Sequence, residues 1–305
     1  MAVNDNNLFP AIMEREVLSA LLQHQVRADL RWIIDSPPLF QGSDGLLALS
    51  GDRAESLELL DAVERLLETQ PSRRVGLYFE SLVDAWLAHA LKLAMEARHL
   101  QIFENGRTVG EIDFCVRDKN GARWRLECTI KFYLHHPSSQ SIHGSAFVGP
   151  DPRDSFERKY HHLMERQLRL SVPEFEPVHR ALPVARGILF YHVTDPFNPD
   201  RPVEANPNHL RGLWMRASEW RDFEGESFDI DRVVHLPKPY WLSGLFNPGL
   251  TSQELTWHEA GCAIKVHFEQ SNSPLMMSFR SSGGAKNTES VRCIVVNDAW
   301  PTFDL

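Results

Sequence analysis

The spacing of hydrophobic residues predicts helices in the first part of the chain. Apolar residues recur at close to helical period over Glu14–Ile34 and over Ala54–Glu68, and a proline-containing segment follows each stretch. A third helix is predicted over Leu77–Glu96, with Glu80 and Asp84 one turn apart beside its apolar stripe. The region before the first predicted strand is therefore expected to be helical.

The hydrophobic period then changes to two, which is typical of strands. The pair Asn105-Gly106 lies between two such runs and is a strong hairpin signal. A second turn is predicted at Asp118–Ala122, before another alternating run. We therefore expect one helix followed by a three-strand antiparallel meander.

The last two strands of this meander each place their charged side chains on a single face. Successive side chains of a strand point to opposite faces, so Glu111 and Asp113 share one face of the middle strand. Glu127, Thr129 and Lys131 share one face of the third strand. The opposite faces are apolar, with Ile112, Phe114 and Val116 on the middle strand and Leu126, Cys128 and Ile130 on the third.

The register between these two strands follows from the same alternation. A two-residue turn at Asn120-Gly121 would place Phe114 opposite Glu127, and a slip of one residue moves every side chain to the wrong face. A three-residue loop with Gly121 in the left-handed conformation instead pairs Asp113 with Glu127. The second register is favoured, and it places the two Cβ atoms roughly 5 Å apart.

The rest of the chain is predicted to mix helices, strands and loops. A polar loop is expected over His135–Asp154, and the segment Asp195–Asn208 is rich in Pro and Asn. The predicted helices are Asp154–Leu170 and Leu210–Asp222, and the predicted strands are Ala185–Val193, Val233–Leu236, Cys262–Phe268 and Val291–Val296.

Composition indicates a globular protein of the cytoplasm. The 305 residues are 43% hydrophobic and 24% charged, no apolar run is long enough to cross a bilayer, and the first residues do not resemble a signal peptide. The four cysteines lack metal-binding spacing, and Cys115 and Cys128 are expected on opposite faces, unbridged. The net charge of −9 lowers the expectation of nucleic-acid binding but leaves room for a local basic groove.

The paired acids favour a site for a hard divalent cation, Mg²⁺ or Mn²⁺. Such ions take oxygen ligands from one or two carboxylates together with water and substrate phosphate. Asp113 and Glu127 are the expected ligands, and Glu80 on the preceding helix is a possible third carboxylate. Lys131 is the expected cation that orients water or stabilises a phosphate in its transition state.

This arrangement resembles the core of the PD-(D/E)XK, or restriction-endonuclease-like, nucleases. Between Arg74 and Val193 the predicted elements follow the order αβββαβ of that superfamily. Asp113 and Glu127 match its motif acids, and Glu80 matches its frequent helix acid. The superfamily places lysine two residues after the second acid, where this chain has Thr129; Lys131 follows on the same face, about 6–7 Å further along the strand.

A second resemblance covers the whole chain. Several short segments are similar to a bacterial family of uncharacterised proteins, domain of unknown function 1853. They are Gly76-Leu-Tyr-Phe-Glu, Gly110-Glu-Ile-Asp-Phe, Lys131-Phe-Tyr-Leu, Gln167-Leu-Arg-Leu, Arg186-Gly-Ile-Leu-Phe-Tyr and Asn208-His-Leu-Arg-Gly-Leu-Trp. This resemblance implies that the Glu-x-x-x-Lys spacing of Glu127 and Lys131 is the form of the motif found in this family. It implies no activity.

Together these patterns predict an α/β protein built on a restriction-endonuclease-like core. The core is expected at residues 73–195, with a helical N-terminal region at 1–72 and a mixed C-terminal extension at 196–305 that packs on it. The leading functional hypothesis is a Mg²⁺-dependent (or Mn²⁺-dependent) nuclease that acts on DNA rather than RNA.

The alternatives remain open at this stage. One is a catalytically silent core that binds nucleic acid, a protein partner or a second copy of the chain, which the displaced lysine and the acidic net charge favour. Lys159 and Gln167 are candidates to contact a nucleic-acid backbone, although a solvated helix face is the favoured interpretation of these two residues. Asp113 and Glu127 could likewise be solvated on the open face of an antiparallel sheet.

Overall fold

The computed structural model describes residues 15–42, 66, 74–136, 145–170, 175–223, 230–244, 254–281 and 291–301. Within these residues nine strands form a single sheet in the order β1-β2-β3-β5-β6-β9-β8-β7, with β4 paired to β3. The strands are β1 Ala94–Glu104, β2 Arg107–Arg117, β3 Arg123–His135, β4 Phe147–Val148, β5 Arg180–His192, β6 Leu210–Arg216, β7 Ile230–Leu236, β8 Leu275–Ser281 and β9 Val291–Val296.

The helices include both regular and irregular turns. The α-helices of the described part are α1 Arg15–Asp35, α4 Val75–Ala85, α5 Phe156–His161 and α6 Trp257–Gln270. Two π-helical turns continue helices, namely η1 Trp86–Ala90 after α4 and η3 His162–Arg166 after α5, and the 3₁₀ turns are η4 Gln167–Arg169 and η6 Ala217–Arg221. The predicted helix Ala54–Glu68 lies outside the described residues apart from Leu66.

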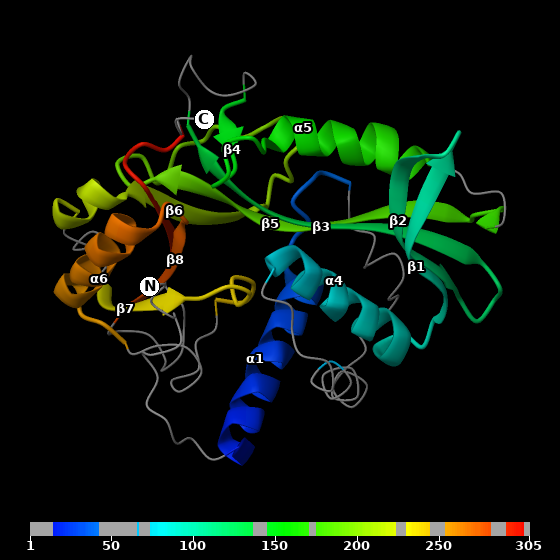
Figure 1. Cartoon of the computed structure of the whole chain (residues 1–305), viewed down its shortest axis with the longest axis horizontal. Coiled ribbons are helices and arrows are strands. Elements are labelled where there is room, and N and C mark those ends of the chain that lie inside the picture. Colours follow the sequence, from blue (N-terminus) through cyan, green and yellow to red (C-terminus); the bar gives the residue numbers. More distant parts are fainter. Residues whose placement is uncertain are drawn as a thin grey trace.

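The sheet is mixed, with a parallel centre and antiparallel ends. β1, β2 and β3 form the predicted antiparallel meander, which is confirmed, and β3 then pairs in parallel with β5. Parallel pairing continues through β6 and β9, and antiparallel pairing returns at β8 and β7. Figure 1 shows α4 and α1 on one side of the central strands and α5 on the other.

Alternate side chains of β3 enter different cores on the two faces of the sheet. Phe132 and Leu134 pack with residues of α1 and α4, whereas Tyr133 packs with Phe156 and Leu163 from the helical segment that begins with α5. A third cluster joins α6 to β6, β8 and β9. The α/β class expected from the sequence is therefore confirmed, with both faces of the central strands covered.

The predicted helix over residues 77–96 is too long at its C-terminal end. The helical segment ends with η1 at Ala90, and Lys92 follows with a left-handed φ of +52°. Ala94 already pairs with Arg117 in the sheet. Apolar residues between Leu91 and Met95 continue the helical stripe by chance, because pairing with the neighbouring strand decides their conformation.

Two C-terminal predictions are wrong. The segment predicted as a helix at residues 210–222 begins with strand β6, whose buried residues lie between β5 and β9. The segment predicted as a strand at residues 262–268 belongs to helix α6. Its N-terminus has a capping box formed by Thr256 and Glu259, a signal that should take precedence over a short alternation.

Other features agree with the expectations. The four cysteines are free, so Cys115 and Cys128 are unbridged as predicted. None of the helices in the described residues is long and apolar enough to span a bilayer. The sheet continues without a break from β5 into β6, so residues on the two sides of the predicted boundary at 195 share one sheet.

Candidate metal centre

The candidate site lies where β2 separates from β3. The predicted three-residue loop is confirmed, because Gly121 has a left-handed φ of +83° and the Asp118 amide donates to the Ala122 carbonyl at 2.9 Å. The backbone pairing that starts at this loop reaches Phe114 and Leu126 and stops there. Asp113 and Glu127 are the next residues on the two strands.

Where the backbone pairing of β2 with β3 stops, the carboxylate of Asp113 accepts a hydrogen bond from the backbone of β3. Its Oδ2 accepts a hydrogen bond from the amide of Cys128 at 2.6 Å, and the residue is 8% exposed. Burial raises the pKa of Asp113, and the hydrogen bond from Cys128 offsets part of that rise. The amide of Cys128 thus holds the carboxylate of Asp113 in place at the point where β2 and β3 separate.

Glu127 is fully enclosed next to Asp113, with an exposed fraction of 0%. Its Oε2 accepts a hydrogen bond from Nε2 of Gln167 at 3.3 Å. Among the described residues its Oε1 has no hydrogen-bond donor, and Nε of Arg125 lies 3.9 Å away. Burial, followed by the charge of Asp113, raises the pKa of Glu127 to about 9. The alternative of solvated acids on an open sheet face is wrong, because the segment that begins with α5 covers this face.

Lys159 and Gln167 come from this covering segment and join the acids. Nζ of Lys159 donates to Oε1 of Gln167 at 3.2 Å, and Gln167 in turn contacts Glu127. Burial, followed by the charge of Lys131, lowers the pKa of Lys159, whereas Asp113 and Glu127 raise it. The side chains of Lys159 and Gln167 therefore belong to the group of side chains around Glu127. They do not form the solvated helix face that was the alternative from sequence.

Lys131 lies on the predicted face of β3 but is engaged elsewhere. Its Nζ forms an ion pair with Oδ2 of Asp154 at 2.5 Å, and Oδ1 of Asp154 accepts a hydrogen bond from the hydroxyl of Tyr133 at 3.3 Å. Lys159 lowers the pKa of both Asp113 and Glu127; Arg125 has a larger effect on Glu127, and His99 also lowers the pKa of Asp113. The structure thus brings Lys159, rather than Lys131, to the paired acids.

Glu80 reaches the site from α4 on the other side of the sheet. Its Oε2 lies 4.0 Å from Nδ1 of His99, and its side chain is 22% exposed. Burial, followed by the charge of Asp113, raises the pKa of Glu80 to about 7, whereas His99 lowers it. The helix acid expected from sequence is therefore near Asp113.

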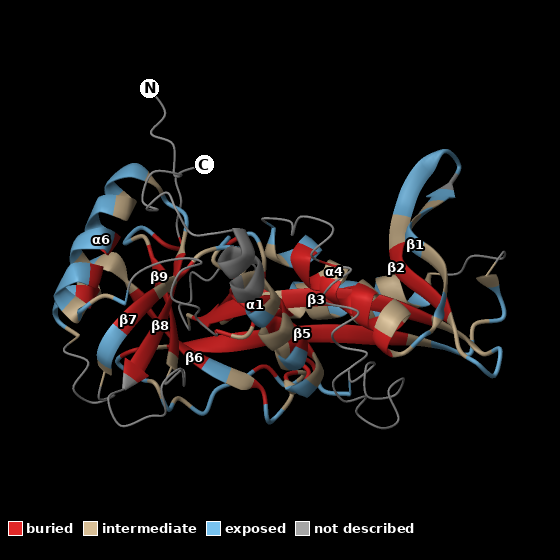
Figure 2. Cartoon of the chain, turned by 90° about the horizontal axis from the view of Figure 1, so that it is seen from below, coloured by how far each residue is buried: buried red, intermediate tan, exposed pale blue. Residues whose placement is uncertain are grey.

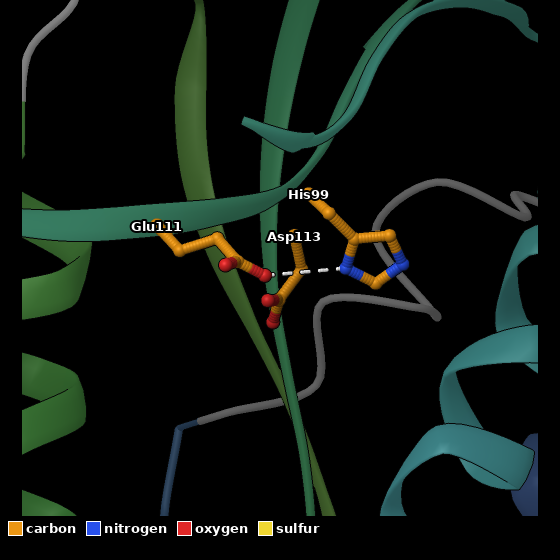
Figure 3. A group of neighbouring side chains, drawn as sticks. All are labelled: His99, Glu111 and Asp113. Atoms are coloured by element: carbon orange, nitrogen blue, oxygen red, sulfur yellow. Dashed lines mark hydrogen bonds and ion pairs between the residues drawn. The ribbon is translucent and has the colours of Figure 1, made fainter. Parts of the chain in front are cut away.

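Sequence reasoning missed His99, which lies in β1. In the register of β1 with β2, the pairs Arg98–Phe114 and Leu100–Ile112 place His99 opposite Asp113. Ligand atoms of His99, Glu111 and Asp113 lie within 4.8 Å of one another, and Nδ1 of His99 is 3.3 Å from Oε1 of Glu111 (Figure 3). His99 has a left-handed φ of +47°, a conformation that is uncommon outside glycine.

A family model spans nearly all of the described sheet and the whole of this site. The model of the family described as domain of unknown function (DUF1853) matches residues 28–296. The chain belongs to the DUF1853 family. Comparison with curated proteins and with solved structures gave no match. The description of the DUF1853 family assigns no activity, so the chemistry of the site has to follow from its geometry.

Three carboxylates of the DUF1853 site lie close enough for their charges to interact. Glu80, Asp113 and Glu127 come from three elements, and the charge of Asp113 raises the pKa of both glutamates. Like charges in a partly buried cluster are stabilised by a bound cation, and carboxylate oxygens suit a hard divalent ion. The carboxylates around Asp113 are therefore chemically suited to Mg²⁺ or Mn²⁺.

Proposed function

We propose that this DUF1853 protein is a metal-dependent nuclease that hydrolyses phosphodiester bonds of nucleic acid. The observation that carries the proposal is the position of Asp113 and Glu127 just beyond the point where β2 leaves β3. Within the part of the chain that the structure describes, one oxygen of the fully buried Glu127 has no hydrogen-bond donor. A buried carboxylate with an unpaired oxygen is costly unless a cation or proton compensates it.

The order and direction of the elements support the proposal. The chain runs through α4, the meander β1-β2-β3, α5 and β5, with β5 parallel to β3. This is the αβββαβ order that the resemblance to PD-(D/E)XK nucleases implies for residues 73–195. Fold likeness raises the expectation of nuclease chemistry, while the arrangement of the acids is the argument for it.

Each residue has a distinct role in the proposed reaction. Asp113, Glu127 and Glu80 hold the divalent ion, which when bound lowers the pKa of water and neutralises charge on the phosphodiester. Lys159 is a partly buried cation that lowers the pKa of both Asp113 and Glu127, and it is suited to hold the attacking water or stabilise the transition-state phosphate. Gln167 positions both Lys159 and Glu127.

This assignment changes the part expected of Lys131. Because Asp154 binds Lys131, we propose that Lys131 acts indirectly, through its repulsion of Lys159. The displacement of lysine from the usual strand position is then compensated by a lysine on the covering helix. DNA remains the preferred substrate class, with RNA as the alternative.

A cleavage assay tests the proposal. Chelator-treated full-length protein is incubated with labelled single-stranded and double-stranded DNA and RNA, with and without Mg²⁺ or Mn²⁺. Asp113→Asn keeps a hydrogen-bond acceptor for Cys128, so it is expected to fold and to lose cleavage by at least about 100-fold. Lys159→Ala is expected to lose more activity than Lys131→Ala, and Lys265→Ala on the exposed surface of α6 is the matched control.

The outcomes separate the two functional hypotheses. Equal cleavage by the wild type and Asp113→Asn would place the activity elsewhere or in a contaminant. Metal binding without cleavage of any of the four substrates would overturn the nuclease proposal. Retention of nucleic acid by that inactive protein would then favour the silent binding module.

A further inference from the structure

A ring nitrogen of His99 lies among the carboxylates of the candidate centre. A ring nitrogen of His99 and carboxylate oxygens of Glu111 and Asp113 lie within 4.8 Å of one another (Figure 3). In addition, Oε2 of Glu80 lies 4.0 Å from Nδ1 of His99. Ligand atoms around one ion at roughly 2.1–2.2 Å per bond are at most about 4.4 Å apart. Small rotations of these partly exposed side chains therefore suffice to surround one ion.

A second observation indicates that the cluster is more than a surface group of acids. Glu127 is fully buried next to Asp113, and among the described residues its Oε1 has no hydrogen-bond donor. The charge of Asp113 also raises the pKa of both Glu80 and Glu127. A cation bound beside Asp113 would compensate this excess negative charge.

We propose that His99 is a nitrogen ligand of this centre and makes it prefer Mn²⁺ to Mg²⁺. The inference rests on the metal centre of the proposed function and deepens it by naming the cofactor. Mg²⁺ is bound by oxygen ligands and keeps much of its water, whereas imidazole suits transition metals. Mn²⁺ accepts imidazole nitrogen and also suits carboxylates, which form the rest of the donor set.

The backbone at His99 suggests the best variant for a test. His99 has a φ of +47°, and asparagine is among the few residues that adopt this conformation readily. His99→Asn therefore removes the imidazole with little backbone strain and offers a hard amide oxygen instead. His161→Ala is the matched control, because His161 also contacts a glutamate, Glu165 at 2.9 Å, on an exposed helix face.

The test combines calorimetry with pulsed electron paramagnetic resonance on chelator-treated full-length protein. Wild type is expected to bind Mn²⁺ at least about tenfold more tightly than Mg²⁺, and bound Mn²⁺ is expected to show coupling to a histidine nitrogen. His99→Asn is expected to lose that coupling and to weaken Mn²⁺ binding about tenfold or more, with a smaller change for Mg²⁺. His161→Ala is expected to match wild type.

The failures of the two proposals are distinguishable. Mn²⁺ bound without nitrogen coupling, or weakened equally with Mg²⁺ by His99→Asn, would overturn the role of His99 and leave the carboxylate centre in place. Binding of neither ion by the wild type would overturn both proposals. Nitrogen coupling in a protein that cleaves no nucleic acid would support the Mn²⁺ site and overturn the nuclease.

Discussion

Burial of the Glu127 side chain is expected to lower the stability of the metal-free protein, although the same side chain is expected to bind the metal ion. In the metal-free protein its burial beside Asp113 raises its pKa to about 9 from an ordinary value of 4.5. The folded state therefore holds a proton that the unfolded state has released, so this group lowers the free energy of unfolding as pH rises from about 4.5 to about 9. The same carboxylate is an expected ligand of the metal ion.

Glu127→Gln is predicted to stabilise the metal-free protein and to abolish metal binding. At pH 8 the amide avoids the cost of protonating the carboxylate on folding, and we expect a gain of about 1–3 kcal/mol in the free energy of unfolding from urea titration. Added Mn²⁺ should stabilise the wild type but not this variant. Glu269→Gln, at an exposed position, is the control. A variant less stable than wild type at pH 8 would contradict the account of Glu127.

His235 on β7 is predicted to make the protein sensitive to acid. Burial, with a smaller contribution from His267, lowers the pKa of His235 from 6.5 to about 4. Between pH 6.5 and 4 the unfolded state binds the extra proton, so stability falls as pH is lowered through this window, by at most roughly 3 kcal/mol. His235→Gln should flatten this dependence in urea titrations at several pH values. Parallel curves for the two proteins would exclude His235 as the cause.

The positions of single side chains show how far sequence reasoning reached at the site. Alternation and turn length were enough to predict the faces of β2 and β3 and their register as far as Phe114 and Leu126. The predicted backbone pairing of Asp113 with Glu127 does not form, because the two strands separate there and Asp113 accepts a hydrogen bond from the Cys128 amide instead. His99 was out of reach, because an unbroken two-residue hairpin at Asn105-Gly106 would place Arg98 opposite Asp113. A bulge between Ile102 and Phe103 shifts the register by one residue and brings His99 there instead.

At the scale of elements, Arg125 ties β3 to the helical segment that covers the site. Its guanidinium donates to the carbonyls of Leu170, Leu168 and Gln167. These carbonyls end a helical segment, where backbone acceptors lack partners within the helix. The position of Gln167, and with it the hydrogen bond to Glu127, therefore depends on a strand residue next to the candidate ligand.

Arg125→Met is predicted to destabilise the protein by about 3–5 kcal/mol. The substitution removes the guanidinium donor from the partly buried carbonyls of Leu168 and Leu170 and removes the cation nearest to Glu127. Urea titration measures the effect, and Arg125→Met combined with Glu127→Gln should cost less than the sum of the single changes, because the two groups are coupled. A loss below about 1 kcal/mol for Arg125→Met would show that water or other groups replace the guanidinium.

Elements near the site were easier to predict than those beyond it. The meander has a strict period of two and strong turn residues, so local pattern and tertiary pairing agree. β6 was mistaken for a helix because it is buried between two parallel neighbours, where a strand has a nearly continuous apolar sequence. The parallel pairing of β3 with β5 joins residues far apart in the chain, and periodicity alone carries no information about such contacts.

At the scale of the whole molecule, the sheet and the largest apolar cluster connect the predicted regions. The cluster includes Val26 of α1, Phe79 of α4, Phe132 of β3, Trp214 of β6 and Ile294 of β9. In addition β6 covers one edge of β5 from Ile188 to His192. The residues that position the metal centre therefore share a core with both ends of the described chain.

A fragment spanning residues 73–195 is therefore predicted not to fold by itself. It would expose the buried edge of β5 and the face that α1 covers, and an unpaired apolar edge strand promotes aggregation. The full chain is expected to melt in one cooperative transition with matching calorimetric and van't Hoff enthalpies. The fragment should lack near-ultraviolet circular dichroism and elute as aggregates from size-exclusion columns. A monomeric fragment with a cooperative melt and Mn²⁺ binding would show instead that the nuclease-like core is an autonomous domain, with the C-terminal strands added to a sheet that is already stable.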